Sequence, residues 1–158
     1  MSGTESNIGR ERLLGMMESL SFFKDFTPYE KKRFAGFETH VKKFKMGEYV
    51  IRQGSKDTSF FILISGTVSV TQTGKSGVLA QLNPGDFFGE VSFLTGQPRI
   101  SNIVADVPLT VLRVDAVLME RLGTEIREKI KDLIIIRLIN RLDDMNKLIS
   151  SLSFMARY

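Results

Sequence analysis

One segment of the sequence combines the residue types that bind a phosphate group. It runs from Pro84 to Arg99 and reads PGDFFGEVSFLTGQPR. Gly89 can turn the backbone where a Cβ atom would clash, and the residues after it can form one or two helical turns that end at Gly96. The start of such a helix presents free backbone N–H groups at the positive end of the helix dipole. The segment therefore predicts an anion site around residues 89–92.

Three side chains extend this predicted site. Arg99 follows a proline that fixes its approach, and its planar guanidinium suits two phosphate oxygens. Ser92 can add a hydroxyl group. Glu90 would repel an anion, but a carboxylate accepts hydrogen bonds, so its natural partner is a sugar hydroxyl next to the phosphate. A phosphate beside a ribose describes a nucleotide.

The sequence around this segment is typical of a small all-β structure. From residue 40 to residue 114 it breaks into short β-rich runs, such as Tyr49–Ile51 and Phe60–Ile64. Glycines separate these runs at intervals of roughly ten residues, the spacing of small sandwiches and barrels. We therefore predict an antiparallel, jelly-roll-like β barrel over residues 40–114, with an interior that can hold a ligand.

Helices are predicted on both sides of the barrel. Residues 10–39 place apolar side chains at helical spacing, and Thr27 with Pro28 forms an N-cap followed by a proline at the first helical position. Residues 115–152 return to helix, with Asp115 as an N-cap before a short helix that precedes a longer one. The order along the chain is therefore helix, barrel, helix.

The predicted domain limits follow from these assignments. Residues 1–9 are small and polar, which predicts a disordered tail. Residues 10–158 are predicted to form a single α+β domain, mainly β, because 158 residues close one apolar core and are too few for two full-sized domains.

The segment from Pro84 to Arg99 and the strands predicted around it resemble the cyclic-nucleotide-binding domain family, and the resemblance covers residues 20–149. The match consists of the run ILISGTV at residues 62–68, followed by Gly85-Asp86, Phe88-Gly89-Glu90, Pro98-Arg99 and Ala105. The chain is similar to a stand-alone, bacterial-type cAMP- or cGMP-binding domain, related to the sensor domain of the cyclic-AMP receptor protein. The resemblance implies an eight-stranded β roll with N-terminal helices, a short phosphate-binding helix and C-terminal hinge and lid helices.

The resemblance also implies how a ligand is held. In that family the backbone after the glycine and the arginine hold the cyclic phosphate, and the glutamate holds the ribose 2′-hydroxyl. The ligand-binding residues predicted here are Phe88, Gly89, Glu90, Val91, Ser92, Arg99, Ile100 and Ser101. Arg137 and Arg141 lie four residues apart on the last helix and are predicted as lid residues that stack on the purine, with a solvated surface position as the alternative.

The residues after the arginine depart from the family pattern. The family usually has a small or hydroxyl residue, then alanine, then often threonine, whereas this chain has Ile100, Ser101 and Asn102. A hydroxyl directly after the arginine often accompanies cGMP preference, so its absence favours cAMP. The predicted function is a cyclic nucleotide sensor that signals by movement of its C-terminal helix. The alternative is a degenerate domain that acts as a protein-interaction scaffold without binding a nucleotide.

Composition excludes several classes of chemistry. The chain has no cysteine and one histidine, His40, so thiolate chemistry is excluded and a metal site of clustered histidines is not expected. No carboxylate cluster lies near Arg99 in the sequence, so we predict no catalytic residue, no enzyme activity and no cofactor besides the nucleotide ligand. The longest apolar run, Leu133–Ile136, is far shorter than the roughly 20 residues of a membrane span, which predicts a cytoplasmic protein without membrane contact.

Nucleic acid is not an expected partner. A net charge of +4 is modest for a protein that binds nucleic acid, and lysines such as Lys42 and Lys43 are predicted to be solvated. Residues 150–158, which follow the long helix, are too few for a helix-turn-helix. The expected partners are a cyclic nucleotide and a downstream protein that the sequence does not identify.

The long C-terminal helix carries an apolar stripe. Its members are Ile135, Leu138, Leu142, Met145 and Ile149, which follow one another in steps of three and four like a coiled-coil seam. The stripe can pack on its own chain or pair with the same helix of a second copy. A homodimer through this helix is therefore one of two open interpretations.

Overall fold

The computed structural model describes residues 2–157, with side chains for residues 9–37 and 39–156. Its internal contacts divide the chain into two compact units, Met1–Gly123 and Thr124–Tyr158. The first unit contains all the strands of the described range together with helices α1 to α4. The second unit contains one long helix, α5 (Thr124–Arg157).

The strands of the described residues form two four-stranded antiparallel sheets. Their bounds are β1 (Val41–Phe44), β2 (Tyr49–Ile51), β3 (Phe60–Ser65), β4 (Val68–Thr71), β5 (Ala80–Leu82), β6 (Phe87–Phe88), β7 (Asn102–Ala105) and β8 (Leu109–Val114). One sheet has the order β1-β8-β3-β6 and the other the order β2-β7-β4-β5. This arrangement confirms the predicted α+β fold, mainly β, with an eight-stranded antiparallel β roll.

The apolar core of the roll draws side chains from both sheets. It contains Ile51, Phe61, Leu63, Val68, Phe88, Ile103, Ala105, Leu109 and Val111. The rings of Phe61 and Phe88 stack with their centroids 5.5 Å apart, which ties β3 to β6. Since β6 lies within the predicted phosphate-binding segment and directly precedes Gly89, this packing holds the turn at Gly89 in place.

A second apolar cluster joins the N-terminal helices. Four phenylalanine rings form five ring contacts, with centroids 4.9–5.9 Å apart, between the 3-10 helix η1 (Ser21–Phe23) and α2 (Pro28–Ala35): Phe22, Phe23, Phe26 and Phe34. Thr27 caps α2 as predicted: its hydroxyl accepts from the N–H of Glu30, whose carboxylate accepts from the Thr27 N–H. Aromatic packing and a capping box therefore fix the entry to the roll, where η2 (Glu38–His40) leads into β1.

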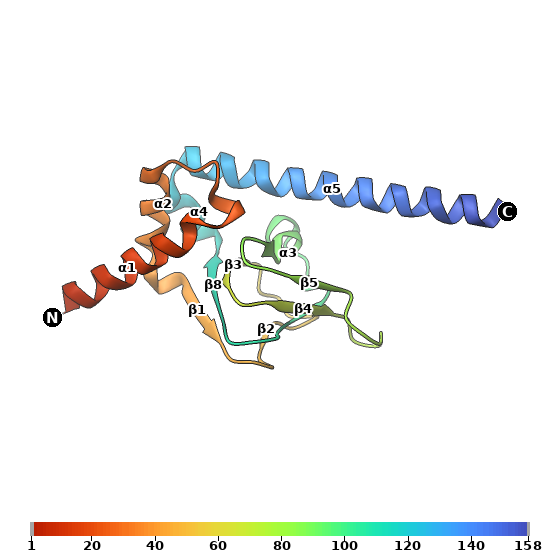
Figure 1. Ribbon diagram of the computed structural model, residues 1–158, viewed down its shortest axis with the longest axis horizontal. Helices are drawn as coiled ribbons and strands as arrows, with labels where there is room; N and C mark the ends of the chain where they lie inside the picture. The colour runs from red at the N-terminus through yellow and green to blue at the C-terminus, as the bar shows by residue number, and fades with distance from the viewer. Residues whose placement is uncertain (1, 158) are drawn as a thin grey trace. The chain divides into compact units, whose positions relative to one another are not determined.

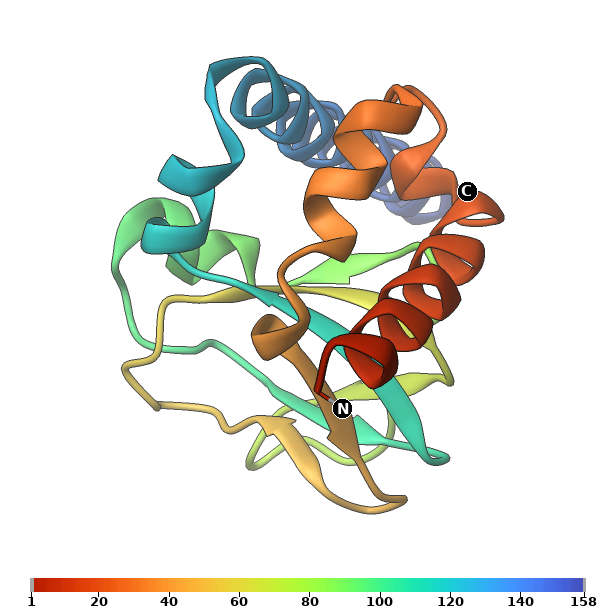
Figure 2. The same ribbon diagram turned by 90° about the vertical axis from the view of Figure 1, so that its left-hand side faces the viewer.

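The predicted disordered tail is instead helical. Helix α1 (Ser2–Glu18) begins at the second residue, so residues 2–9 belong to it, while Met1 lies outside the described residues. Leu13 and Met17 are buried farther along α1, and extending a helix from such an anchored turn is much less costly than starting one. This explains why small polar residues that favour disorder are helical here. Helix α1 lies alongside β1 and β8 (Figures 1 and 2).

The elements after the roll agree with the predicted caps. Asp115 caps α4 (Ala116–Leu122), because its carboxylate accepts a hydrogen bond of 2.8 Å from the Leu118 N–H. Helix α5 is continuous and reaches Arg157, five residues beyond the predicted end near Leu152 (Figure 1). No helix among the described residues is both long and apolar enough to cross a membrane.

Gly66 provides a test of the tight turn between β3 and β4. Its φ is +85°, and a Cβ atom there would lie 2.5 Å from the Leu109 Cβ and 2.9 Å from the Pro108 carbonyl oxygen. Gly66→Ala is therefore expected to lower the free energy of unfolding by about 2–4 kcal/mol, through backbone strain and overpacking. Gly74→Ala is the control, because Gly74 has a φ of +83° but open space around its Cβ position.

Urea unfolding followed by circular dichroism measures both variants. Gly74→Ala should lower the free energy of unfolding only by the cost of backbone strain, about 1–2 kcal/mol. Equal losses in Gly66→Ala and Gly74→Ala would show that the close approach to Leu109 does not matter.

Candidate functional site

The predicted phosphate-binding segment forms a glycine turn followed by a short helix. Strand β6 ends at Phe88, Gly89 has a φ of +86°, and α3 (Glu90–Thr95) follows before Gly96 ends it with a φ of +71°. A Cβ atom on Gly89 would lie 2.9 Å from the Arg99 Nη1 and 3.0 Å from the Ser59 carbonyl oxygen. Both the backbone conformation and the packing therefore require glycine at position 89. Helix α3 lies next to β3 (Figure 1).

Arg99 is the central side chain of this region, and only 4% of its surface is exposed. Its Nη1 donates to the Gly89 carbonyl at 3.0 Å. Its Nη2 donates to the Asp57 carboxylate at 3.0 Å and also to the Ser59 carbonyl. Its Nε has no hydrogen-bond partner among the described residues. The guanidinium is thus fixed in orientation, while two of its five N–H donors, one of them on Nε, are left for another acceptor.

The backbone around Arg99 is held by the loop between β2 and β3. The Arg99 N–H donates to the Ser55 carbonyl at 2.9 Å, and the Arg99 carbonyl accepts from the Gly54 N–H at 2.8 Å. This pair of hydrogen bonds resembles one rung of an antiparallel ladder. These backbone hydrogen bonds position Arg99 independently of its side-chain contacts.

Asp57 joins two arginines at the edge of the site. Its carboxylate accepts from Arg99 and, at 3.2 Å, from the Nη2 of Arg113 on β8. Burial alone would raise the pKa of Asp57, but hydrogen bonds from Ser59 and Arg99 outweigh burial and hold the pKa below its ordinary value. Burial lowers the pKa of Arg99 and Asp57 opposes that change. The pair is therefore ionised at neutral pH.

The first turn of α3 lies beside this arginine and is largely enclosed. Glu90 is 2% exposed and Ser92 is 3% exposed, while Val91 is half-buried. The negative charge of Glu90 favours the charged form of Arg99. Arg99 and the first turn of α3 thus combine a full positive charge, backbone N–H groups and a carboxylate. We call Gly89, Glu90, Val91, Ser92 and Arg99 the α3 site.

The two residues that follow the arginine differ in their surroundings. Ile100 is 61% exposed, so its bulky side chain is not part of the core of the roll. Ser101 is half-buried. The Ile100 carbonyl accepts a hydrogen bond of 3.2 Å from the side-chain amide of Gln72, which connects this segment to the end of β4.

The hydrogen bonds of Asn102 explain why this chain has asparagine at position 102, which the sequence alone does not explain. Its side-chain oxygen accepts from the Gln53 N–H at 2.8 Å, and its side-chain nitrogen donates to the Thr73 hydroxyl at 3.4 Å. The Gln53 side chain in turn accepts from the Thr73 N–H at 2.8 Å. An amide at position 102 therefore links the loops after β2 and β4, which the shorter threonine of the family pattern could not span in the same way.

The predicted site residues are only partly brought together. Gly89 and Glu90 lie next to the Arg99 guanidinium, Val91 and Ser92 follow in the first turn of α3, and Ile100 and Ser101 continue the chain from Arg99. Phe88 places its ring in the core of the roll against Phe61, so its side chain has a packing role. Arg137 and Arg141 lie on α5, in the second compact unit, and their lid role stays a prediction.

Sequence reasoning missed two residues that bind the Arg99 side chain and one that binds Asp57. These are Asp57, Ser59 and Arg113. Asp57 is 42 residues from Arg99 in the sequence. Its local context is a polar loop with no distinctive spacing, so only the pairing of distant strands reveals the contact.

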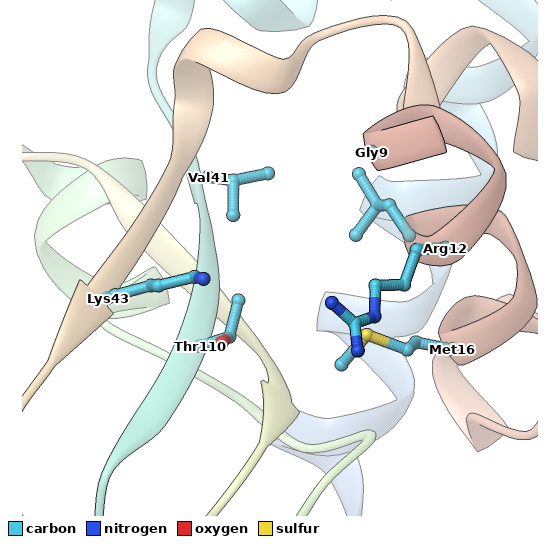
Figure 3. A pocket seen from close by; sticks show the side chains of 7 residues that line it. Gly9, Arg12, Met16, Val41, Lys43 and Thr110 are labelled. Carbon is cyan, nitrogen blue, oxygen red and sulfur yellow. The ribbon is translucent and has the colours of Figure 1, made fainter. Parts of the chain in front are cut away.

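A separate cleft lies between α1 and the outer face of β1 and β8. Its volume is about 490 Å³, and it is lined by Gly9, Arg12, Leu13, Met16, Val41, Lys43 and Thr110. Figure 3 shows Arg12 and Lys43 on opposite walls, with the Met16 side chain beside Arg12. None of these lining residues belongs to the α3 site, so the cleft is a second place where an anion could meet positive charge.

A family model for the cyclic nucleotide-binding domain matches residues 41–125, more than half of the chain. The chain belongs to the cyclic-nucleotide-binding domain family. The matched region of this cyclic nucleotide-binding domain contains the whole roll, the α3 site and Asp57. It therefore includes every described contact of the Arg99 side chain.

Several known proteins are similar to this cyclic nucleotide-binding domain. The cAMP-dependent protein kinase regulatory subunit of Neurospora crassa is 29% identical over 119 residues, which is 75% of this chain and 31% of that protein. The structure of PKAR CBD2 with Sp-2Cl-cAMPS bound is 27% identical, with a TM-score of 0.71 over 90% of this chain and 93% of that one. The Thermus thermophilus catabolite activator protein shares the fold at 24% identity, with a TM-score of 0.68 over 84% of this chain and 63% of its own.

The chain spans less than a third of the length of each of the first curated relatives that it matches. Those relatives are named as regulatory subunits. Among the residues that the structure describes, no group of three or more histidine, cysteine, aspartate or glutamate side chains is placed to hold a metal ion.

The Asp57 contacts lead to a pH-dependent prediction. A carboxylate whose pKa is lowered in the folded state stabilises that state above its unfolded pKa, and this stabilisation is lost as the pH falls through the folded pKa. Asp57→Asn should therefore lower the free energy of unfolding by about 1 kcal/mol at pH 7, a value reduced for the partial exposure of Asp57. The difference between wild type and variant should shrink below about pH 4.

Urea unfolding at pH 7 and at pH 3.5 measures this difference. Asp143→Asn, which removes an exposed carboxylate from α5, is the matched control and should change stability little at either pH. A difference for Asp57→Asn that stayed constant with pH would contradict the assigned role of the carboxylate.

Proposed function

We propose that this protein is a cyclic nucleotide sensor that binds cAMP at the α3 site and signals through its C-terminal helix. Membership in the cyclic-nucleotide-binding domain family supports the ligand class. The observation that carries the proposal is the buried guanidinium of Arg99, held beside the first turn of α3 with its Nε unpartnered among the described residues. A buried arginine in this setting favours an anion as its additional partner.

The proposed ligand contacts follow from the chemistry of each group. The phosphate accepts hydrogen bonds from Arg99 and from backbone N–H groups at the start of α3, where a helix presents N–H groups at the positive end of its dipole. Glu90 accepts a hydrogen bond from the ribose 2′-hydroxyl, as the family resemblance implies. Ser92 adds a hydroxyl beside the phosphate. These contacts use Glu90 and Arg99 for binding, and we assign no catalytic step to them.

The residue after the arginine supports cAMP as the preferred nucleotide. Ile100 carries no hydroxyl that could donate to the guanine of cGMP. The first curated relatives are named as regulatory subunits of cAMP-dependent protein kinase, which supports the same preference. For this chain the downstream partner is proposed to be a protein, and the signal is a population shift that requires tighter ligand binding to one position of α5.

One observation favours a second candidate, a scaffold that binds no nucleotide. Asp57 already provides a carboxylate oxygen 3.0 Å from Arg99, so the guanidinium has an internal anion before any ligand arrives. An internal partner of this kind can satisfy a buried arginine in a domain that has lost its ligand. The two candidates differ in whether cAMP binds at micromolar concentration.

Arg99→Ala tests the phosphate contact. Loss of a charge-assisted hydrogen-bonded contact, worth about 1.5–3 kcal/mol, should weaken cAMP binding by roughly ten- to a hundredfold. Isothermal titration calorimetry with cAMP and with cGMP measures the affinities, and wild type should bind cAMP more tightly. Arg12→Ala is the control, since Arg12 lines the separate cleft between α1 and the sheet.

Each result has a distinct meaning. Weaker binding in Arg99→Ala with unchanged binding in Arg12→Ala supports the α3 site. The reverse pattern would place the nucleotide in the cleft. No heat from wild type with either nucleotide at high micromolar concentration would support the scaffold.

Glu90→Gln tests the ribose contact. Wild type should bind 2′-deoxy-cAMP about tenfold more weakly than cAMP, because one hydrogen bond to a charged group is lost. Glu90→Gln should bind cAMP more weakly and should discriminate less between the two ligands. The four affinities form a double-mutant cycle, and a coupling energy of zero would assign the 2′-hydroxyl to another residue.

A further inference from the structure

The cleft between α1 and the outer face of β1 and β8 has one helical wall. The lining residues of this wall follow the three- and four-residue spacing of a single helix face: Gly9, Arg12, Leu13 and Met16. Leu13 is buried and Met16 is half-buried, whereas Arg12 is exposed. A Cβ atom on Gly9 would have no neighbouring atom within 4 Å among the described residues, so the wall is open at this position. The helical wall is therefore apolar and carries one positive charge.

The opposite wall is the face of β1 and β8 that is turned toward α1. Lys43 lies directly opposite Thr110 in the antiparallel register, and Val41 shares their face because side chains alternate along a strand. Figure 3 shows the Lys43 ammonium and the Arg12 guanidinium pointing into the space between the two walls. The lining residues include these two positive charges and no carboxylate. An anion in this space would therefore be attracted from both walls.

Side chains provide the hydrogen-bond donors of the cleft. Backbone N–H groups in the interior of α1 are used by the helix, and those of β1 and β8 lie in the plane of the sheet and do not point out of its face. The donors that reach the cleft are therefore the guanidinium of Arg12, the ammonium of Lys43 and the hydroxyl of Thr110. This small set suits the two oxygens of a carboxylate, which the planar fork of an arginine can bind together.

Apolar side chains line the cleft beside these donors. They are Leu13, Met16 and Val41, and the flexible thioether of a methionine adapts to the shape of a bound chain. The volume of about 490 Å³ lies within the range of roughly 300–1,000 Å³ that small-molecule sites occupy. A mostly apolar lining with a few convergent polar groups is also typical of such sites. The cleft therefore combines a place for a charged head group with a place for a hydrocarbon chain.

We propose that this cleft is a ligand site separate from the α3 site, and that it binds an amphipathic carboxylate of the fatty-acid class. The carboxylate lies between Arg12 and Lys43. The hydrocarbon chain lies against Leu13, Met16 and Val41. This site goes beyond the proposed nucleotide binding and does not depend on it, because none of its lining residues belongs to the α3 site.

The charge of the ligand distinguishes this cleft from other apolar surface of the chain. Apolar side chains of α5 such as Leu142 and Ile149 are more than half exposed and could also bind a hydrocarbon chain. Such a surface needs no negative charge on the ligand, whereas the cleft attracts an anion and repels a cation. Two ligands with the same chain and opposite head groups therefore separate the two kinds of binding.

Isothermal titration calorimetry of the full-length chain with sodium decanoate tests the site. Decanoate should bind with a dissociation constant below about 1 mM. Decyltrimethylammonium, which has the same chain and a positive head group, should bind at least roughly tenfold more weakly, because it gains no charge-assisted hydrogen bond.

Single substitutions locate the carboxylate. Arg12→Gln and Lys43→Gln should each weaken decanoate binding by roughly three- to tenfold, because each removes one charge-assisted contact at a solvent-exposed position. Lys42→Gln is the matched control. It removes the same charge from the same strand, but residue 42 lies on the opposite face of β1 and does not line the cleft. Its affinity for decanoate should equal that of wild type.

A bulky residue at position 9 should close the cleft. Gly9→Phe places a ring in the open space of the helical wall and should abolish decanoate binding. Gly15→Phe is the matched control, because Gly15 lies on the same helix, has the same open surroundings and does not line the cleft. Circular dichroism should show both variants folded, since neither ring meets a neighbouring atom at the Cβ position.

Three results would overturn the proposal. No binding of decanoate by wild type at up to about 5 mM would show that the cleft holds no such ligand. Equal binding of decanoate and decyltrimethylammonium would assign the heat to exposed apolar surface. Decanoate binding that is unchanged in Gly9→Phe, or weakened equally in Gly9→Phe and Gly15→Phe, would place the ligand elsewhere on the chain.

Discussion

The burial of one full charge organises the functional part of this domain. Arg99 is 4% exposed, and a guanidinium can be removed from water only if nearly all of its charge is met by acceptors. Asp57, the Ser59 carbonyl and the Gly89 carbonyl supply those acceptors. The Arg99 Nη1 lies where it would collide with a Cβ atom on residue 89. The buried position of Arg99 therefore also requires glycine directly before α3.

This constraint links the fold to the site. The acceptors come from the loop before β3 and from Gly89 directly after β6, and Arg113 on β8 donates a further hydrogen bond to Asp57. These segments are brought together only when β3 pairs with both β6 and β8. The site therefore exists only in the folded roll, and the stacked rings of Phe61 and Phe88 stabilise the pairing that assembles it.

Features that depend on neighbouring residues could be predicted from the sequence, and features that depend on distant pairing could not. The Thr27 and Asp115 caps and the helix between Gly89 and Gly96 rest on contacts within a few residues, so local patterns identify them. Asp57 meets Arg99 across 42 residues, and no local pattern encodes that meeting. The helical residues 2–9 were missed because their order comes from the anchored part of α1 and not from their own composition.

The count of donors explains why an arginine alone does not make the α3 site. A guanidinium has five N–H donors. Three of the Arg99 donors are used by the described hydrogen bonds to Gly89, Asp57 and Ser59. A phosphate carries more acceptor capacity than the two that remain, so the other oxygens require the backbone N–H groups at the start of α3. In the proposed phosphate complex, Asp57 would limit the binding energy that Arg99 can supply, and the backbone N–H groups of α3 would supply the rest.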